Sequence, residues 1–214
     1  MHPDEAKYLK DLHDYAAETR RLFSSKMKPE RERMVCRAFL RCLGVQFQED
    51  EILAPCEEPV DVAFRSAKFQ IRELMEPDRR RGDELKNFQD AVQNATSIED
   101  VMLPYLPPRP LSLQDLVDKV TEALRDKVAK YGKGCKDLDA LVYVDLENRC
   151  LDVKTNISNL AKLKSQGWRS VSVLFPPHGI IFHAHPKDGP NFILAYSGRA
   201  LSRWDDWDTL FEKL

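Results

Sequence analysis

The 214-residue sequence lacks long apolar runs, and none approaches the roughly 20 residues that a membrane-spanning helix needs. The N-terminal stretch MHPDEAKYLKDLHDYAAETRR also lacks the apolar core and small-residue cleavage site of a secretory signal. Glycine is scarce, with eight residues, whereas 43% of the chain is hydrophobic and 32% is charged. This composition is typical of a soluble globular protein, and we expect it to reside in the cytoplasm.

Paired cysteine motifs are missing as well. The five cysteines, at positions 36, 42, 56, 135 and 150, form no CxxC pair and are odd in number. A disulfide framework and a zinc knuckle are therefore not expected, and the cysteines are interpreted as reduced thiols.

The chain has no strong charge of one sign, because its net charge is only -2. Basic residues nevertheless gather between positions 65 and 81, and such a local patch can contact phosphates on an otherwise acidic protein. A solvated charged face is the alternative interpretation. The residues predicted to contact nucleic acid are Arg65, Lys68, Arg79, Arg80 and Arg81.

The length favours one domain, spanning residues 1–214, around a single core. We expect N-terminal helices and a strand meander in residues 1–102, a stiff Pro-rich connection in 103–112 and an α/β half in 113–214. The predicted fold class is α/β, with a mixed sheet flanked by helices on both faces.

Helical periodicity predicts helices over 3–24, 28–44, 82–95, 111–134 and 157–167. Strands are predicted at 45–55, 60–64, 68–74, 138–146, 150–154, 170–175, 179–185 and 191–197. In the second helix, Val35, Phe39 and Cys42 form an apolar stripe, and Glu32 falls on the same inward side. Ser112 is the expected cap of the fourth helix.

The segment PVDVAFRSAKFQIREL, residues 59–74, is predicted to be a hairpin. A turn at Ser66-Ala67 would pair Phe64 with Phe69 and would place Asp61 opposite Arg72. Because side chains alternate along a strand, Asp61, Gln70 and Arg72 then share one face.

An aspartate beside another oxygen ligand suits Mg²⁺, which proteins usually hold through one or two carboxylates, water and a substrate phosphate. A nearby cation can stabilise the negative charge that develops during phosphodiester hydrolysis. The simpler alternative is a cross-strand ion pair between Asp61 and Arg72, with Gln70 hydrogen-bonded beside it.

The inward Glu32, the "PVD" that begins a strand and the Gln-x-Arg triplet on the next strand resemble the restriction-endonuclease-like superfamily, whose motif joins Pro-Asp to Asp/Glu-x-Lys. The segments ERERMVCRAFLRCLGVQF, VDVAFRSAKFQIREL and RRRGDE more closely resemble a bacterial endonuclease family of unknown function. This resemblance spans most of the chain.

The resemblance implies a Mg²⁺-dependent, or Mn²⁺-dependent, endonuclease that hydrolyses phosphodiester bonds of DNA. It assigns Asp61, Gln70 and Arg72 to catalysis and Asp61, Glu32 and Gln70 to the metal. Gln70 and Arg72 depart from the acidic and lysine positions of the motif, and both changes weaken metal binding or water activation. The alternative is a catalytically silent module on the same fold that binds nucleic acid or protein.

A second candidate site lies in the C-terminal half. Asp152 and Lys154 form a literal Asp-x-Lys on a predicted strand, and Asp139 and Asp145 lie on the strand expected to pair with it.

Overall fold

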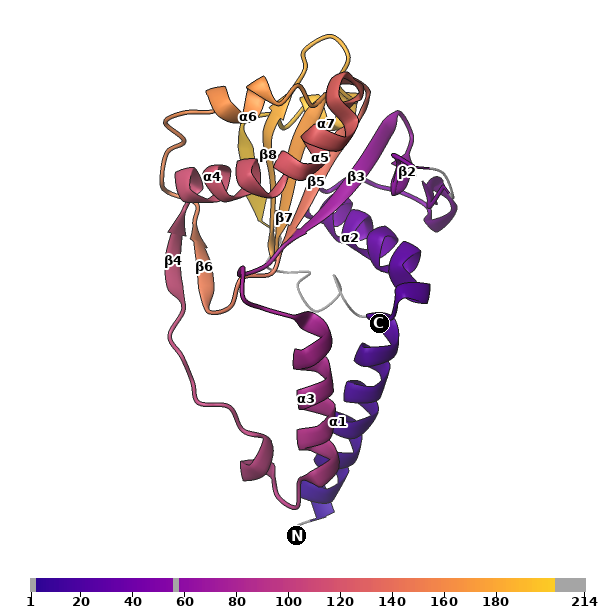
Figure 1. The fold of residues 1–214 in the computed structure, drawn as a ribbon, viewed down its shortest axis with the longest axis vertical. Helices are drawn as coiled ribbons and strands as arrows, with labels where there is room; N and C mark the ends of the chain where they lie inside the picture. The colour runs from indigo at the N-terminus through magenta and orange to yellow at the C-terminus, as the bar shows by residue number, and fades with distance from the viewer. Residues whose placement is uncertain (1–2, 56–57, 203–214) are drawn as a thin grey trace.

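The computed structural model describes residues 3–55 and 58–202, which fold around a seven-stranded sheet (Figure 1). In spatial order the strands are β1 (Ile52–Leu53), β2 (Val62–Phe64), β3 (Ala67–Leu74), β5 (Asp139–Val144), β7 (Ser170–Phe175), β8 (His178–Ala184) and β9 (Arg199–Ser202). The pairs β3–β5 and β5–β7 are parallel, and the other neighbours are antiparallel. The predicted mixed α/β architecture is therefore confirmed.

Helix α2 (Lys28–Cys42) covers one face of this sheet. Phe39 and Cys42 of the predicted stripe are buried in one cluster with Phe64 and Phe69 of the hairpin, and Val35 is partly buried against it. Leu40, which was not in the predicted stripe, is buried there as well. The helix also lies very close to β8, where an added Cβ on Gly179 would approach Cys42 to 2.8 Å.

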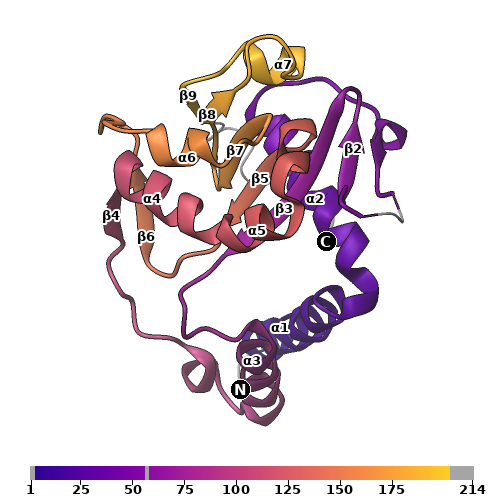
Figure 2. The ribbon, with the colours of Figure 1, turned by 45° about the horizontal axis from the view of Figure 1, so that its top comes forward.

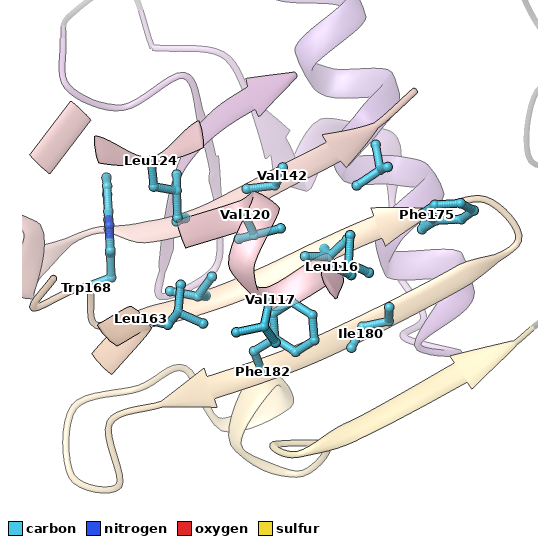
Figure 3. Packing of buried hydrophobic residues seen from close by; sticks show 14 of the residues in the cluster. Leu116, Val117, Val120, Leu124, Val142, Leu163, Trp168, Phe175, Ile180 and Phe182 are labelled. Carbon is cyan, nitrogen blue, oxygen red and sulfur yellow. The ribbon is translucent and has the colours of Figure 1, made fainter. Parts of the chain in front are cut away.

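The opposite face is covered by α4 (Leu113–Ala123), α5 (Arg125–Tyr131) and α6 (Ala161–Ser165). Figure 3 shows Leu116, Val120 and Leu124 against the strand residues Val142 and Ile180. The Ser112 cap is confirmed, because its hydroxyl accepts a hydrogen bond from the Asp115 amide at 3.0 Å. The single helix predicted over 111–134 is instead divided at Leu124, the capping residue of both α4 and α5.

Helices α1 (Pro3–Leu22) and α3 (Arg81–Asn94) lie side by side and extend away from the sheet (Figures 1 and 2). Only Ala16 and Val92 are fully buried within the described parts of these two helices. The short 3-10 helices are η1 (Ser25–Met27), η2 (Glu49–Glu51), η3 (Ile98–Val101) and η4 (Gly132–Asp137). Among the described helices, none is both long enough and apolar enough to cross a membrane.

The predicted hairpin between residues 138–146 and 150–154 is wrong. Strand β6 (Arg149–Asp152) instead pairs in parallel with β4 (Arg109–Ser112), which forms at the end of the Pro-rich connection. Both edges of β5 are already paired, with β3 on one side and β7 on the other, so β6 cannot join it.

The strand predicted over residues 191–197 is also wrong. Helix α7 (Asn191–Leu194) forms there, with the Leu194 amide bonded to the Pro190 carbonyl at 2.9 Å. Its apolar side chains pack on the hairpin, since the rings of Phe64 and Phe192 lie 5.3 Å apart. A short apolar run without clear periodicity does not distinguish a strand from a helix.

The hairpin has a different register from the one predicted. The turn lies at Arg65-Ser66, where Arg65 adopts φ 51°, and Phe64 pairs with Ala67 rather than with Phe69. The shift equals two residues, so each side chain keeps its predicted face. Asp61 consequently lies opposite Gln70, not opposite Arg72.

Candidate active site at the β2–β3 hairpin

Asp61 directly precedes β2 and is fixed by hydrogen bonds from β3. Its amide donates to the Phe69 carbonyl at 2.9 Å. Its carboxylate oxygen Oδ2 accepts from the Ile71 amide at 2.8 Å and from the side-chain amide of Gln70. These bonds hold Oδ2 against the hairpin and leave Oδ1 to face helix α2.

Gln70 is buried, with 1% of the residue exposed, and both ends of its side-chain amide are hydrogen-bonded. Its Nε2 donates to the Pro59 carbonyl at 3.0 Å and to Asp61. Its Oε1 accepts from the Tyr131 hydroxyl at 3.1 Å. Because Nε2 faces two acceptors, the amide orientation is determined by its partners. Gln70 therefore positions Asp61 and turns its own oxygen toward Tyr131.

Lys28 is the first residue of α2, and its ammonium lies between the carboxylates of Glu32 and Asp61. Its Nζ is 3.1 Å from Glu32 Oε1 and 3.5 Å from Asp61 Oδ1. Both carboxylate side chains are only 12% exposed, whereas Lys28 reaches them from solvent. Glu32 thus faces the hairpin, as its place on the helix predicted.

The titration of these groups reflects their burial and mutual charge. Burial, together with the negative charge of Asp61, raises the pKa of Glu32 above its usual value. Burial also opposes the charge of Lys28, but the hydrogen bond with Glu32 and the charge of Asp61 outweigh it and raise the pKa of Lys28. The fold therefore brings two acidic groups together around one cationic position.

The donor set at this position fits a hard divalent cation. Glu32 and Asp61 each direct one carboxylate oxygen to the point where Lys28 Nζ lies. Mg²⁺ is commonly held by one or two carboxylates, with water completing its shell. Among the described residues, no group of three or more His, Cys, Asp or Glu side chains could hold a metal, so any cation here depends on this pair.

Arg72 shares the Gln70 face of β3, but the alternative ion pair with Asp61 is not formed. Asp61 pairs with Lys28 instead. Within residues 3–55 and 58–202, the buried Nε of Arg72 has no hydrogen-bond partner.

Helix α5 contributes side chains that the sequence analysis missed. Tyr131 binds Gln70, and the Nζ atoms of Lys127 and Lys130 lie 5.7 and 5.3 Å from the Tyr131 ring centroid. The only signal in the sequence is the one-turn spacing of Lys127 and Tyr131, which is common on solvated helices.

Arg79 and Arg81, predicted to contact nucleic acid, take part in an intramolecular ion-pair network. Arg79 binds both carboxylate oxygens of Glu84, at 2.7 and 2.9 Å. Arg81 pairs with Glu73 and Asp145. Much of the positive charge of residues 79–81 therefore forms ion pairs within the molecule.

The remaining predicted contacts, Arg65, Lys68 and Arg80, are exposed. Arg65 pairs with Glu51 at 3.0 Å and lies over the Phe64 ring. Arg65 and Lys68 are at the opposite end of β3 from residues 79–81, and the structure does not bring all five predicted residues into one cluster.

The second candidate site does not assemble in the described structure. Asp139 is fully buried, where it binds Arg169, the Ser170 hydroxyl at 2.7 Å and the Lys68 amide at 2.9 Å. Asp145 pairs with Arg81.

Asp152 accepts a hydrogen bond from the Lys154 amide at 3.1 Å, within its own turn, and lies in the separate β4–β6 sheet. These aspartates are therefore held apart by different structural partners.

The fold and site together define a mixed α/β protein with a carboxylate pair at a β-hairpin. Residues 4–205 match the model of a family described as "Putative endonuclease, protein of unknown function (DUF1780)". The chain belongs to this family. No match was found among curated proteins.

A solved structure is similar over almost the whole chain. It is that of a protein of unknown function, PA4535 from Pseudomonas aeruginosa strain PAO1, described as belonging to the monooxygenase superfamily. The two share 27% sequence identity and a TM-score of 0.66, over 93% of this chain and 96% of that chain.

Proposed function

We propose that the protein is a metal-dependent endonuclease of the restriction-endonuclease-like type. Its active site, which contains Asp61, would hydrolyse phosphodiester bonds of DNA. The observation that carries this proposal is the convergence of Glu32 and Asp61 on one cation position. The family description, with its reference to an endonuclease, supports the same class of reaction.

Glu32 and Asp61 would hold Mg²⁺ or Mn²⁺ once the Lys28 ammonium moves aside. Such an ion supplies charge stabilisation at a phosphoryl oxygen and lowers the pKa of water bound to it. Gln70 and the Ile71 amide orient Asp61, because both donate hydrogen bonds to its Oδ2. A direct ligand role for Gln70 requires its amide to turn by about half a rotation, at the expense of the bonds to Pro59 and Asp61.

Plasmid nicking is the direct test of this function. The parent protein should convert supercoiled to nicked DNA with Mg²⁺ or Mn²⁺ and should stop on addition of a chelator. Asp61→Asn should reduce the rate at least about 100-fold, since it removes the charged ligand while keeping the side-chain shape. Asp137→Asn, an exposed change outside the site, is the matched control. Metal-independent nicking, or equal rates in the parent and Asp61→Asn, would refute the proposal.

A catalytically silent module is the second candidate, and the position of Lys28 favours it. The ammonium already lies within ion-pair distance of both carboxylates, so it offsets part of their negative charge without a metal. In that case DNA or protein binding should persist in Asp61→Asn, and Mg²⁺ should leave the thermal midpoint of the parent unchanged.

A further inference from the structure

Four cationic side chains lie near Asp61 or near its neighbours Gln70 and Tyr131, and only some of them form an ion pair with a carboxylate. Lys28 is paired with Glu32 and Asp61, and Lys130 is paired with Glu58. Arg72 and Lys127 have no ion pair within the part of the chain that the structure describes. The site therefore contains two cations that form no ion pair with a described carboxylate, although the charge of Asp61 attracts Lys127.

Arg72 is confined by the strand that carries it. It lies in register with Val142 of the neighbouring parallel strand, on the same face as Gln70 two residues away. Its buried Nε has no partner among the described residues. A buried guanidinium nitrogen without an acceptor is unfavourable, so this group is suited to receive an anionic ligand.

Lys127 approaches the same region from α5. Its Nζ lies 5.7 Å from the ring centroid of Tyr131, whose hydroxyl binds Gln70, the residue that holds Asp61. Burial lowers the pKa of Lys127, and the charges of Lys28, Lys130 and Arg72 lower it further against the attraction of Asp61. Lys127 is thus held close to other cations rather than solvated alone.

We infer that Lys127 and Arg72 form a subsite for a phosphate group of a nucleic-acid chain beside Asp61. This inference rests on the proposed function and extends it by naming the side chains that hold the substrate phosphate. Arg72 from β3 and Lys127 from α5 would each offer positive charge and N–H donors to the oxygens of a phosphodiester. An anion there would also give the Arg72 Nε its missing acceptor.

If Lys127 belongs to such a subsite, replacing it should stabilise the folded protein and weaken its binding of DNA. Folding holds an unmatched, half-buried cation in place, so Lys127→Met should raise the thermal midpoint by a few degrees at pH 7. The same change should weaken binding of a short DNA duplex about tenfold at 50 mM salt. It should also reduce the slope of log affinity against log salt by about 0.9.

The test is fluorescence anisotropy of a labelled 20-base-pair duplex in EDTA, where metal-dependent cleavage cannot occur. Lys133→Met removes an exposed lysine of η4 and is the matched control, which should bind as the parent does. Lys127→Arg, which keeps the charge, should restore most of the affinity.

Equal affinity and salt slope in the parent and Lys127→Met would overturn the subsite, whatever the nicking assay shows. Stabilisation by inorganic phosphate that disappears in Lys127→Met, combined with normal duplex binding by that variant, would also overturn it, because the ligand would then be a free phosphate. Lys127-dependent duplex binding without nicking would keep the subsite and refute only the hydrolytic function.

Discussion

The hydrogen bonds of Gln70 require an amide, and not a carboxylate, at this position. A carboxylate at this place would set one oxygen, in the position of Nε2, against the Pro59 carbonyl and the Asp61 carboxylate, both of which are acceptors. The amide instead donates to both of them and accepts from Tyr131. The surrounding groups therefore favour a neutral amide over a carboxylate at position 70.

Gln70→Glu should accordingly destabilise the protein at pH 7. The new carboxylate loses two donated hydrogen bonds and repels Asp61, and we expect a loss of about 1–3 kcal/mol in the free energy of unfolding. Urea denaturation of the parent and variant measures it. The exposed Gln93→Glu in α3 is the control, and equal stability of Gln70→Glu and the parent would show that Gln70 does not position Asp61 in this way.

The raised pKa of Glu32 has a defined effect on the pH dependence of stability. A carboxyl whose pKa is higher in the folded state favours folding when protonated, and this contribution is lost as the pH rises through the folded-state pKa. Relative to the parent, Glu32→Gln should therefore gain stability as the pH increases from about 4 to 7. Thermal midpoints across this range test the sign, with Glu30→Gln as the control on the same helix. A parent that gains stability over Glu32→Gln as the pH rises would contradict the assignment.

At the scale of elements, Asp139 shows that a conspicuous acid can be structural. It joins the beginning of β5 to Arg169 and Ser170 at β7, and it also accepts the Lys68 amide of β3. Three neighbouring strands are thus connected through one buried carboxylate.

Asp139→Asn should lower the free energy of unfolding by about 3–5 kcal/mol, because it leaves the Arg169 charge without its partner. Chemical denaturation provides the measurement, and Asp137→Asn, exposed two residues earlier, should change it by less than about 0.5 kcal/mol. If Asp139→Asn were fully stable but had lost nicking activity, the second candidate site, which contains Asp139, would be the active site instead.

The elements differ in how well the sequence predicts them. Helices α1, α2 and α3 follow from their periodicity, and the antiparallel order β1–β2–β3 follows from close spacing. The strand predicted over 45–55 is nevertheless reduced to Ile52–Leu53, because η2 occupies Glu49–Glu51. The partner of β6 could not be predicted, because it depends on both edges of β5 being occupied by strands distant in sequence.

The same distinction holds within the site. Asp61 and Gln70 were predicted to share a face, and this prediction survives a two-residue change of register because alternation has a period of two. The contributions of Lys28, Lys127 and Tyr131 depend on how α2 and α5 pack around the hairpin. No local pattern carries that information.

At the scale of the whole molecule, the basic residues have unequal access to a ligand. Arg79 is engaged with Glu76, Glu84 and Asp145, whereas its neighbour Arg80 is exposed. If DNA extends past the hairpin toward α3, Arg80 is the one of the three residues 79–81 that can contact the DNA backbone.

Arg80→Ala should reduce the salt-dependence slope of DNA binding by about 0.9 without changing stability, because it removes one phosphate contact. Arg79→Ala should instead lower the free energy of unfolding, since Glu84 and Asp145 lose their shared cation. Anisotropy titrations at several salt concentrations and urea denaturation separate the two effects. A slope that is the same in Arg80→Ala and the parent would exclude this residue from the interface.

The central claim is that Glu32 and Asp61 form one cation position, which Lys28 holds in the absence of a metal. Calorimetric titration of Mn²⁺ into the parent, Lys28→Met and the double variant Lys28→Met/Asp61→Asn tests it most directly. Removing the competing ammonium should strengthen Mn²⁺ binding at least about tenfold, and the added Asp61→Asn change should abolish that gain because one charged ligand is lost. Mn²⁺ binding that is no tighter in Lys28→Met than in the parent would contradict the account.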